Sequence, residues 1–456
     1  MKSATIVGAG LVGSLWSVYL AKAGYKVTIL EMRSDLRKAD ISAGKSINLA
    51  LSVRGWTALE SAGVADEVKD IAIPMYGRTM HDEAGNLTYQ PYGQDGQAIF
   101  SVSRAGVNCR MMEIAEKYGQ AEILFEKQCL DVDFENAIVY YKDVKTGEEG
   151  QLKSDVVFAA DGAFSAVRYK SMQKQRGFNF SQHFIEDGYR EILLPANADG
   201  SYKLEKNRLH IWPRGRFMMI ALPNEDGSFT CTLFMPGSNH EYAFDKLKSK
   251  DDVNHFFKEV FPDFYEMMPE IGDAWEDHPL SGMVIIRCFP WSYGKVSLIG
   301  DSAHATVPFY GQGMNSGFED CRIMNELMIK HNEDWEKVFK EFETVRKPDG
   351  DGLQDLSLHN YYVMRDYVAD PEFLLQKKFE LRISKLYPNK YLPLYSQVSF
   401  SNIRYSEAYS KGMEQDAFIK EIMAEHDIQK LFDEDKVDDL IHEIFAERPV
   451  YDLTTN

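Results

Sequence analysis

A glycine-rich turn near the N-terminus has the residue types and spacing of a nucleotide-binding loop. It reads Gly8-Ala9-Gly10-Leu11-Val12-Gly13, follows the β-favouring run 5–7 and opens a helix-like stretch that stops at Gly24. In such a turn Gly8 permits tight chain reversal, Gly10 lets the backbone approach a pyrophosphate, and Gly13 lets the helix pack on the strands. The free N–H groups of the helix N-terminus then face the phosphates. The pattern predicts a dinucleotide-binding βαβ unit.

The second strand of this unit, residues 26–30, ends on an acid, Glu31, which follows Gly13 by 18 residues. A carboxylate at this position accepts hydrogen bonds from a ribose and disfavours a 2′-phosphate. The predicted resident nucleotide is therefore FAD or NAD rather than NADP. An ordinary glycine turn is the alternative, but the strand, the helix and the acid all agree with a nucleotide site.

Two more predicted buried strands end on acid–glycine pairs. Residues 156–160 run into Asp161-Gly162, and residues 295–299 run into Gly300-Asp301. The carboxylate of Asp301 can accept from a second sugar or ribityl hydroxyl, whereas for Asp161 an acid that merely caps a strand-to-helix turn is an equally good interpretation of the pair taken alone. The sequence thus offers Asp161 and Asp301 as cofactor contacts.

The glycine-rich loop 308–315 opens another predicted helix. Its free N–H groups and the positive end of the helix dipole suit a delocalised anion, such as reduced flavin. The loop adds three candidate cofactor contacts, Gly313, Met314 and Asn315.

The composition limits the class of protein. A chain of 456 residues suggests two or three domains, and a net charge of −19 argues against nucleic acid or an anionic membrane as a partner. The five cysteines form no C-x-x-C pair and the histidines show no metal-ligand spacing, so we expect no metal and a reduced, cytoplasmic protein. No apolar run approaches the roughly 20 residues that span a bilayer, and the N-terminus leads directly into a strand. We expect a soluble protein without a signal peptide.

The order of predicted elements favours an α/β fold. We expect a Rossmann-like FAD-binding domain with an inserted antiparallel β-sheet substrate domain and a C-terminal helical region. In the inserted sheet, residues 208–222 and 228–235 are strand-like, and residues 75–92 are expected to form a hairpin. The predicted boundaries are 1–72, 97–175 and 281–350 for the FAD-binding domain, 73–96 and 176–280 for the β-sheet substrate domain, and 351–456 for the helical region.

The glycine loop, the Asp161-Gly162 pair and the Gly300-Asp301 pair, in this order and spacing, resemble the single-component FAD-dependent aromatic hydroxylases. The resemblance implies that NADPH reduces bound FAD, that O₂ adds to give a flavin C4a-hydroperoxide, and that its distal oxygen attacks an electron-rich ring. No second GxGxxG is present, which agrees with NADPH as a transient co-substrate. We assign no side chain a catalytic role, because the flavin is the reagent, and we interpret His304 as structural.

The resemblance is narrower still to the branch of this family that hydroxylates L-kynurenine to 3-hydroxykynurenine, in tryptophan degradation. It is carried by the stretches 45–52, 210–213, 220–224, 228–234 and 307–315. The resemblance implies that Arg78 binds the substrate carboxylate, with polar partners at Tyr92, Asn360 and Tyr395. It implies an apolar wall of Ile220, Leu222, Thr232, Phe234, Phe309 and Met364. It further implies FAD contacts at Val12, Arg33, Ala50, Arg104 and Cys129.

The sequence also departs from its relatives. Tyr310 stands where family members carry Phe or His, the region from about 405 matches least, and the hydrophobic C-terminal anchor of eukaryotic relatives is not seen. Three alternatives stay open: a hydroxylase of another electron-rich aromatic compound such as a phenolic acid, a non-oxygenating FAD reductase, and an FAD-containing scaffold. A halogenase is disfavoured because W-x-W-x-I-P is missing, and an NAD dehydrogenase because Gly300-Asp301 would have no task. The oligomeric state is open, with a homodimer as one option.

Overall fold

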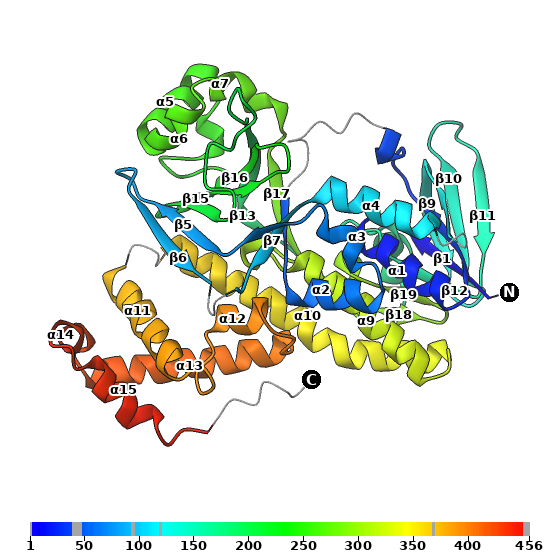
Figure 1. Cartoon of the computed structure of the whole chain (residues 1–456). Coiled ribbons are helices and arrows are strands. Elements are labelled where there is room, and N and C mark those ends of the chain that lie inside the picture. The colour runs from blue at the N-terminus through cyan, green and yellow to red at the C-terminus, as the bar shows by residue number, and fades with distance from the viewer. Residues whose placement is uncertain (1, 39–47, 93–95, 118–120, 367–369, 450–456) are drawn as a thin grey trace.

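A six-stranded, mainly parallel sheet lies on the right of the molecule as drawn in Figure 1. The computed structural model describes residues 2–38, 48–92, 96–117, 121–366 and 370–449, without the side chains of residues 364–366. In sheet order, the strands are β18 (Ser292–Tyr293), β19 (Val296–Leu298), β12 (Val156–Ala159), β1 (Ser3–Val7), β2 (Lys26–Leu30) and β8 (Ala121–Leu124). The central strand β1 pairs in parallel with both β12 and β2. The predicted βαβ unit is confirmed.

Helices cover this sheet, and the closest is α1 (Leu11–Lys22). A Cβ at Gly13 would lie 2.0 Å from the carbonyl oxygen of Gly8, so only glycine allows the helix to start this near the strand. One turn on, Trp16 packs edge-on against Phe158, with ring centroids 5.1 Å apart. The other helices of this part are α2 (Val53–Ser61), α3 (Ala65–Lys69), α4 (Arg104–Lys117), α8 (Asp301–His304) and α9 (Gly313–Lys330).

A seven-stranded sheet stands beside the parallel sheet (Figure 1). In sheet order, its strands are β17 (Ser281–Phe289), β13 (Asn179–Leu194), β16 (Phe229–Pro236), β15 (Phe217–Pro223), β14 (Leu209–Arg214), β5 (Gly77–His81) and β6 (Leu87–Pro91). The expected hairpin is present as β5 and β6. The predicted single strand 208–222 is instead two strands, because Gly215 adopts a left-handed φ of 59° and reverses the chain between them.

The two faces of this sheet have separate tasks. Alternate residues of β15 and β16, among them Met219 and Leu233, pack into a core beneath α5 (Lys250–Val260), α6 (Pro262–Met267) and α7 (Ile271–Ala274). The residues between them face the large cavity described below. The period of two along a strand thus separates core from site.

Two three-stranded sheets and several short helical turns complete the body. The sheets are β11 (Glu149–Lys153), β10 (Ile138–Asp143) and β9 (Lys127–Asp133), and β3 (Asn48–Leu51), β7 (Ile99–Ser103) and β4 (Ile73–Met75). The short turns are η1 (Leu36–Lys38), η2 (Val167–Ser171), η3 (Met172–Lys174), η4 (Phe244–Lys246), η5 (Trp275–Asp277) and η6 (Pro308–Tyr310).

The chain ends in helices, as predicted. They are α10 (Trp335–Asp366), α11 (Pro371–Leu386), α12 (Leu394–Ser399), α13 (Tyr405–Glu425), α14 (Ile428–Asp433) and α15 (Val437–Phe445). The last helices pack around their own core, in which Phe379, Ile419 and Ile441 are fully buried. Within the described part of the chain, no helix is long and apolar enough to cross a membrane. The predicted α/β fold with a helical C-terminal region is confirmed.

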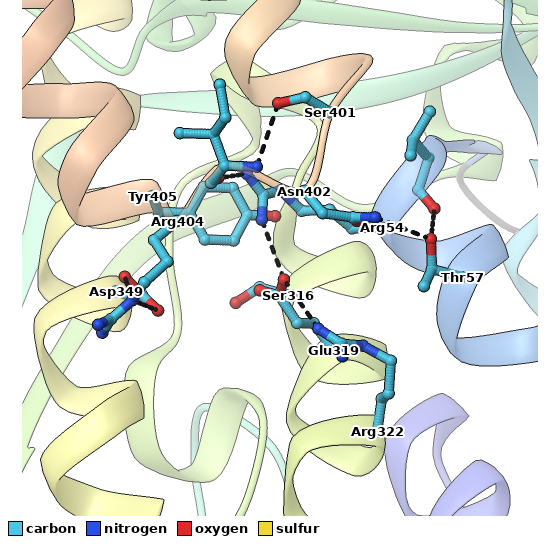
Figure 2. Close-up of polar contacts among 12 residues, drawn as sticks. Arg54, Thr57, Ser316, Glu319, Arg322, Asp349, Ser401, Asn402, Arg404 and Tyr405 are labelled. Carbon is cyan, nitrogen blue, oxygen red and sulfur yellow. Dashed lines mark hydrogen bonds and ion pairs between the residues drawn. The ribbon is translucent and has the colours of Figure 1, made fainter. Parts of the chain in front are cut away.

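A buried network of ion pairs joins α2, α9 and α10 to the segment that enters α13 (Figure 2). Arg54 of α2 donates to Glu319 at 2.9 Å, and the guanidinium of Arg346 donates to Glu319 at 2.8 Å and to Asp320 at 2.7 Å. Arg404 reaches Asp349 at 3.1 Å. Since Arg54, Arg346 and Asp320 are almost wholly removed from solvent, each charge depends on its partners rather than on water.

A second buried polar network lies on the outer face of the seven-stranded sheet. Nε2 of His210 is 2.9 Å from the carbonyl oxygen of Glu205, and its Nδ1 is 3.0 Å from Nε2 of His81. Nδ1 of His81 is 2.7 Å from Oδ2 of Asp263, which also accepts from Trp212 at 2.8 Å. Burial lowers the pKa of His210 to about 4, so this histidine is neutral in the folded protein.

We expect stability to fall between pH 6.5 and pH 4, in part because of His210. The unfolded state binds a proton on this ring near pH 6.5 and the folded state only near pH 4, so acidification favours unfolding by an amount on the order of 3 kcal/mol. In His210→Gln the ring no longer titrates. Denaturant unfolding at pH 7 and pH 4.5 should therefore show a smaller acid loss for the variant than for the unmodified chain, and equal losses would contradict the prediction.

Candidate functional site

A single cavity of about 2180 Å³ extends from the βαβ turn, past the seven-stranded sheet, to the C-terminal helices. Most of the residues predicted for the site line it. The exceptions are Gly13, Tyr92 and Asn315, which lie just behind the lining, and Met364, whose side chain lies outside the described part. The structure thus brings the predicted cofactor and substrate residues to one continuous space.

The nucleotide end of the cavity is shaped by glycines. Gly8 has a φ of 102°, and a Cβ there would lie 2.6 Å from the carbonyl oxygen of Ala160. A Cβ at Gly10 would meet nothing within 4 Å, so the space beside this residue is open to a ligand. No side chain caps the start of α1, which leaves its first N–H groups for an anion.

Glu31 lies at the edge of this turn with its carboxylate well organised. Oε2 accepts from the N–H of Ala9 at 2.9 Å, and Oε1 accepts from the backbone and from Nε of Arg33 at 2.9 and 2.8 Å. Burial acts to raise the pKa of Glu31, but the hydrogen bond and the charge of Arg33 outweigh it and hold the pKa below its ordinary value. The acid is therefore ionised, and both Glu31 and Arg33 line the cavity.

We expect Glu31→Ala to weaken FAD retention. Loss of a charge-assisted hydrogen bond costs about 1.5–3 kcal/mol, or roughly one to two decades in the dissociation constant. The measurement is flavin content after extensive dialysis, with Glu122→Ala, an exposed acid on the neighbouring strand β8, as the matched control. Full flavin occupancy in the Glu31 variant would refute the ribose role.

The two acid–glycine pairs reach the cavity in different ways. Oδ2 of Asp161 accepts from the N–H groups of Ala166 and Val167 at 2.7 and 3.2 Å, whereas its Oδ1 is buried and has no hydrogen-bond partner within the described residues. Burial raises the pKa of this carboxyl above its ordinary value. Asp301 is exposed at the start of α8 and lines the same space. An unpartnered oxygen on Asp161 suits a ligand donor such as a hydroxyl.

The loop before α9 lines the same cavity as these two acids. Gly313 and Met314 line the cavity, but Asn315 is turned into the protein. Its Oδ1 accepts from the N–H of Ser52 at 2.9 Å, and its Nδ2 donates to the carbonyl of Ala50 at 2.8 Å. Asn315 thus ties β3 and α2 to the loop. The N-cap residue of α9, Gln312, makes no side-chain cap hydrogen bond, which leaves the first N–H groups of this helix for a ligand.

The remaining predicted cofactor residues surround this space. Val12, Ala50, Arg104 and Cys129 all line the cavity. Burial raises the pKa of Cys129 to about 12, so the thiol is neutral and serves as an apolar contact. The open glycine turn, the unpartnered Asp161 oxygen and the uncapped helix ends together fit an extended flavin dinucleotide.

Arg78 of β5 lines the cavity at the end where the substrate is predicted to bind. Its guanidinium carbon lies 4.2 Å from the ring centroid of Tyr395 and 5.4 Å from that of Tyr92, and these two rings stack 5.5 Å apart. Nε of Arg78 and the hydroxyl of Tyr92 are buried and have no hydrogen-bond partner among the described residues. Burial beside Tyr395 raises the pKa of Tyr92 well above its ordinary value. The two rings form an aromatic cage around a cation that can bind a carboxylate.

An apolar wall faces this cage. Ile220 of β15 pairs directly with Thr232 of β16, and Phe234 packs on Phe309 with centroids 5.3 Å apart. Nδ2 of Asn360, from α10, donates to the carbonyl of Phe309 at 2.7 Å and lines the cavity. The predicted wall residues that line the cavity are Ile220, Leu222, Thr232, Phe234 and Phe309.

Several cavity residues were missed from the sequence. Leu209, Ile211, Met218 and Tyr189 belong to the same wall, and Gln312 lies in the glycine loop. The alternation 209, 211 and 218, 220, 222 was available as a signal, because residues at this spacing on a strand share a face. Tyr310 also lines the cavity, where it stacks 6.1 Å from Tyr395.

Comparison with known proteins places the chain among flavoproteins. The family model for an FAD binding domain matches residues 1–337. Kynurenine 3-monooxygenase of Christiangramia forsetii is 46% identical over 441 residues, which cover 96% of this chain and 98% of that protein. The Sus scrofa protein of the same name is 41% identical, covering 89% and 85% of the two chains. A solved 2-methyl-3-hydroxypyridine-5-carboxylic acid oxygenase shares the fold, with a TM-score of 0.66, 20% identity and coverage of 82% and 95%.

Proposed function

Because the chain belongs to the kynurenine 3-monooxygenase family, we propose that it hydroxylates L-kynurenine to 3-hydroxykynurenine, consuming NADPH and O₂. The chain is a flavin-dependent aromatic monooxygenase with FAD as its cofactor. The identity of the aromatic substrate, the nicotinamide donor and the reaction path are the proposed part.

The observation that carries the substrate assignment is the cation of Arg78 in its aromatic cage. The guanidinium is always charged, and its buried Nε has no hydrogen-bond partner in the described part of the protein. L-Kynurenine offers an α-carboxylate to this cation and an aniline ring to the apolar wall. Tyr395 and Tyr92 add phenol groups beside the carboxylate site. With its α-carboxylate bound to Arg78, L-kynurenine would place its aromatic ring against the apolar wall.

The residues that would hold FAD are those at the nucleotide end of the cavity. The uncapped start of α1 would bind the pyrophosphate, Glu31 a ribose, Asp161 and Asp301 the sugar and ribityl hydroxyls, and the start of α9 the anionic edge of the reduced ring. When bound and reduced by NADPH, FAD would activate O₂, so that one oxygen atom enters the substrate and the other leaves as water. The side chains bind and orient FAD and the substrate, and we assign none of them the role of an acid or base.

The apolar wall has a chemical task beyond shape. Ile220, Leu222 and Phe234 remove water from the ring-binding space, which protects the activated oxygen from hydrolytic loss as peroxide. Phe234 and Phe309 meet at a tilted angle of 48° and form one side of a slot for a planar ring.

The direct test is NADPH oxidation by the purified FAD protein with a panel of aromatic compounds. We expect strong stimulation by L-kynurenine and little by a phenolic acid such as 4-hydroxybenzoate, which lacks the amino-acid tail. Stimulation by the phenolic acid alone would favour the other-substrate hydroxylase. Bound flavin without stimulation by any compound would favour the scaffold alternative.

A further inference from the structure

The amide of Gln312 is held from behind by the C-terminal region. Its Oε1 accepts a hydrogen bond from the hydroxyl of Tyr405 at 3.0 Å and a second from the hydroxyl of Ser52 at 3.2 Å. Because two donors occupy the oxygen, the NH₂ group of the amide is the part that remains for the cavity that Gln312 lines. Gln312 belongs to the same glycine loop as Gly313 and Met314.

Tyr405 is itself fixed by a residue from the other end of the sequence. The guanidinium carbon of Arg54 lies 4.0 Å from the ring centroid of Tyr405 (Figure 2). Arg54 also donates to the carbonyl groups of Val398 and Ile403. The other side of the guanidinium pairs with Glu319 of α9 at 2.9 Å. Arg54 therefore clamps the chain segment 398–405 against the helix that follows the glycine loop.

The environment keeps Tyr405 a donor. The residue is fully buried, and burial raises the pKa of its hydroxyl above the ordinary value although Arg54 opposes the shift. A phenol that stays protonated can donate to the Gln312 oxygen throughout the physiological range. Tyr405 does not line the cavity, so it acts only through Gln312.

We propose that Tyr405, clamped by Arg54, is a positioning residue that aims the Gln312 amide into the flavin end of the cavity, so that the C-terminal segment 398–405 supports the cofactor site from behind the cavity lining. The inference concerns FAD and does not depend on which aromatic compound is the substrate. The region from about residue 405 is the part of the sequence that resembles the family least. The inference assigns its first residue, Tyr405, a function at the cofactor site.

The test compares Tyr405→Phe with Tyr409→Phe in the full-length FAD protein. The first variant removes one hydroxyl and keeps the ring over Arg54. Tyr409 lies one turn further along α13, is partly buried, and makes no hydrogen bond that the structure records. For Tyr405→Phe we expect a shifted visible absorption spectrum and midpoint potential of bound FAD, and an FAD dissociation constant raised about three- to tenfold, as for one buried neutral hydrogen bond. Tyr409→Phe should match the unmodified protein.

Two further variants separate positioning from general weakening of the fold. Ser52→Ala removes the other donor to Gln312, so it should change the flavin spectrum in the same direction. In a Gln312→Ala background, Tyr405→Phe should have no further effect on FAD affinity, because the group it positions is gone. An unchanged spectrum and FAD affinity in Tyr405→Phe would overturn the inference, as would fully additive losses in the double variant. Failure of L-kynurenine to stimulate turnover would leave these flavin readouts unaffected.

Discussion

Replacing Arg78 with methionine is expected to raise the dissociation constant for L-kynurenine by roughly one to two decades, with FAD content unchanged. A charge-assisted hydrogen bond to a carboxylate contributes about 1.5–3 kcal/mol, and methionine keeps the length and apolar contacts of the side chain while removing the charge. The residue lies on β5 against Tyr395 and Tyr92, at the end of the cavity away from the glycine turn. Substrate titration of the flavin absorption spectrum measures the change.

Arg208→Met is the matched control for this experiment. Arg208 stacks on the ring of Tyr89 at 3.9 Å, on the same edge of the sheet, but it does not line the cavity. Its replacement should leave substrate affinity within about twofold, because a surface cation–π contact contributes only about 0.5–1 kcal/mol to stability and nothing to binding. Equal affinities in the two variants would show that Arg78 is not the carboxylate site.

Replacing Arg346 with methionine is expected to reduce the free energy of unfolding by about 3–5 kcal/mol. Arg346 is 1% exposed and serves Asp320, Glu319 and Asp349, at 2.7, 2.8 and 3.2 Å. Without Arg346, these three buried carboxylates lose the guanidinium that pairs with all of them, and their negative charges are left less well compensated. Burial acts to raise the pKa of Asp320, but His304 and Arg346 outweigh it and hold that pKa below its ordinary value. Denaturant unfolding of the FAD protein measures the loss.

Arg322→Met provides the comparison for Arg346. Arg322 lies two residues beyond Asp320 on the partly exposed side of the same helix, where it pairs with Glu326 at 2.6 Å and only distantly with Glu319 of the network, at 3.8 Å. Surface pairs contribute about 0–1 kcal/mol, so this variant should unfold close to the unmodified protein. A loss for Arg346→Met no larger than that for Arg322→Met would mean that the buried network is not a main source of stability.

The cofactor half of the molecule could be predicted because its signals are local. The turn from Gly8 to Gly13 needs glycine for reasons that lie within a few residues: a left-handed φ at Gly8 and a helix that starts against its own strand at Gly13. Glu31 follows at the end of the next strand, and its carboxylate returns to the N–H of Ala9. Each step can be inferred from the chain order alone.

The contacts that complete the site could not be predicted because they join distant segments. Tyr405 meets Gln312 and Arg54 across separations of 93 and 351 residues, and no local pattern marks that pairing. The turn at Gly215 was missed because apolar residues continue on both sides of it. His304, interpreted as structural, is buried against Asp320 at 2.6 Å and does not line the cavity. The roles of the individual site residues stay predictions.

The most direct test of the proposed function is the fate of oxygen during turnover. The purified FAD protein, supplied with NADPH, L-kynurenine and ¹⁸O₂, should form 3-hydroxykynurenine that carries one ¹⁸O atom, with one NADPH oxidised for each product molecule. Hydrogen peroxide without hydroxylated product would contradict the proposal, because it would mean that L-kynurenine stimulates flavin reduction without being the compound for which the cavity is built.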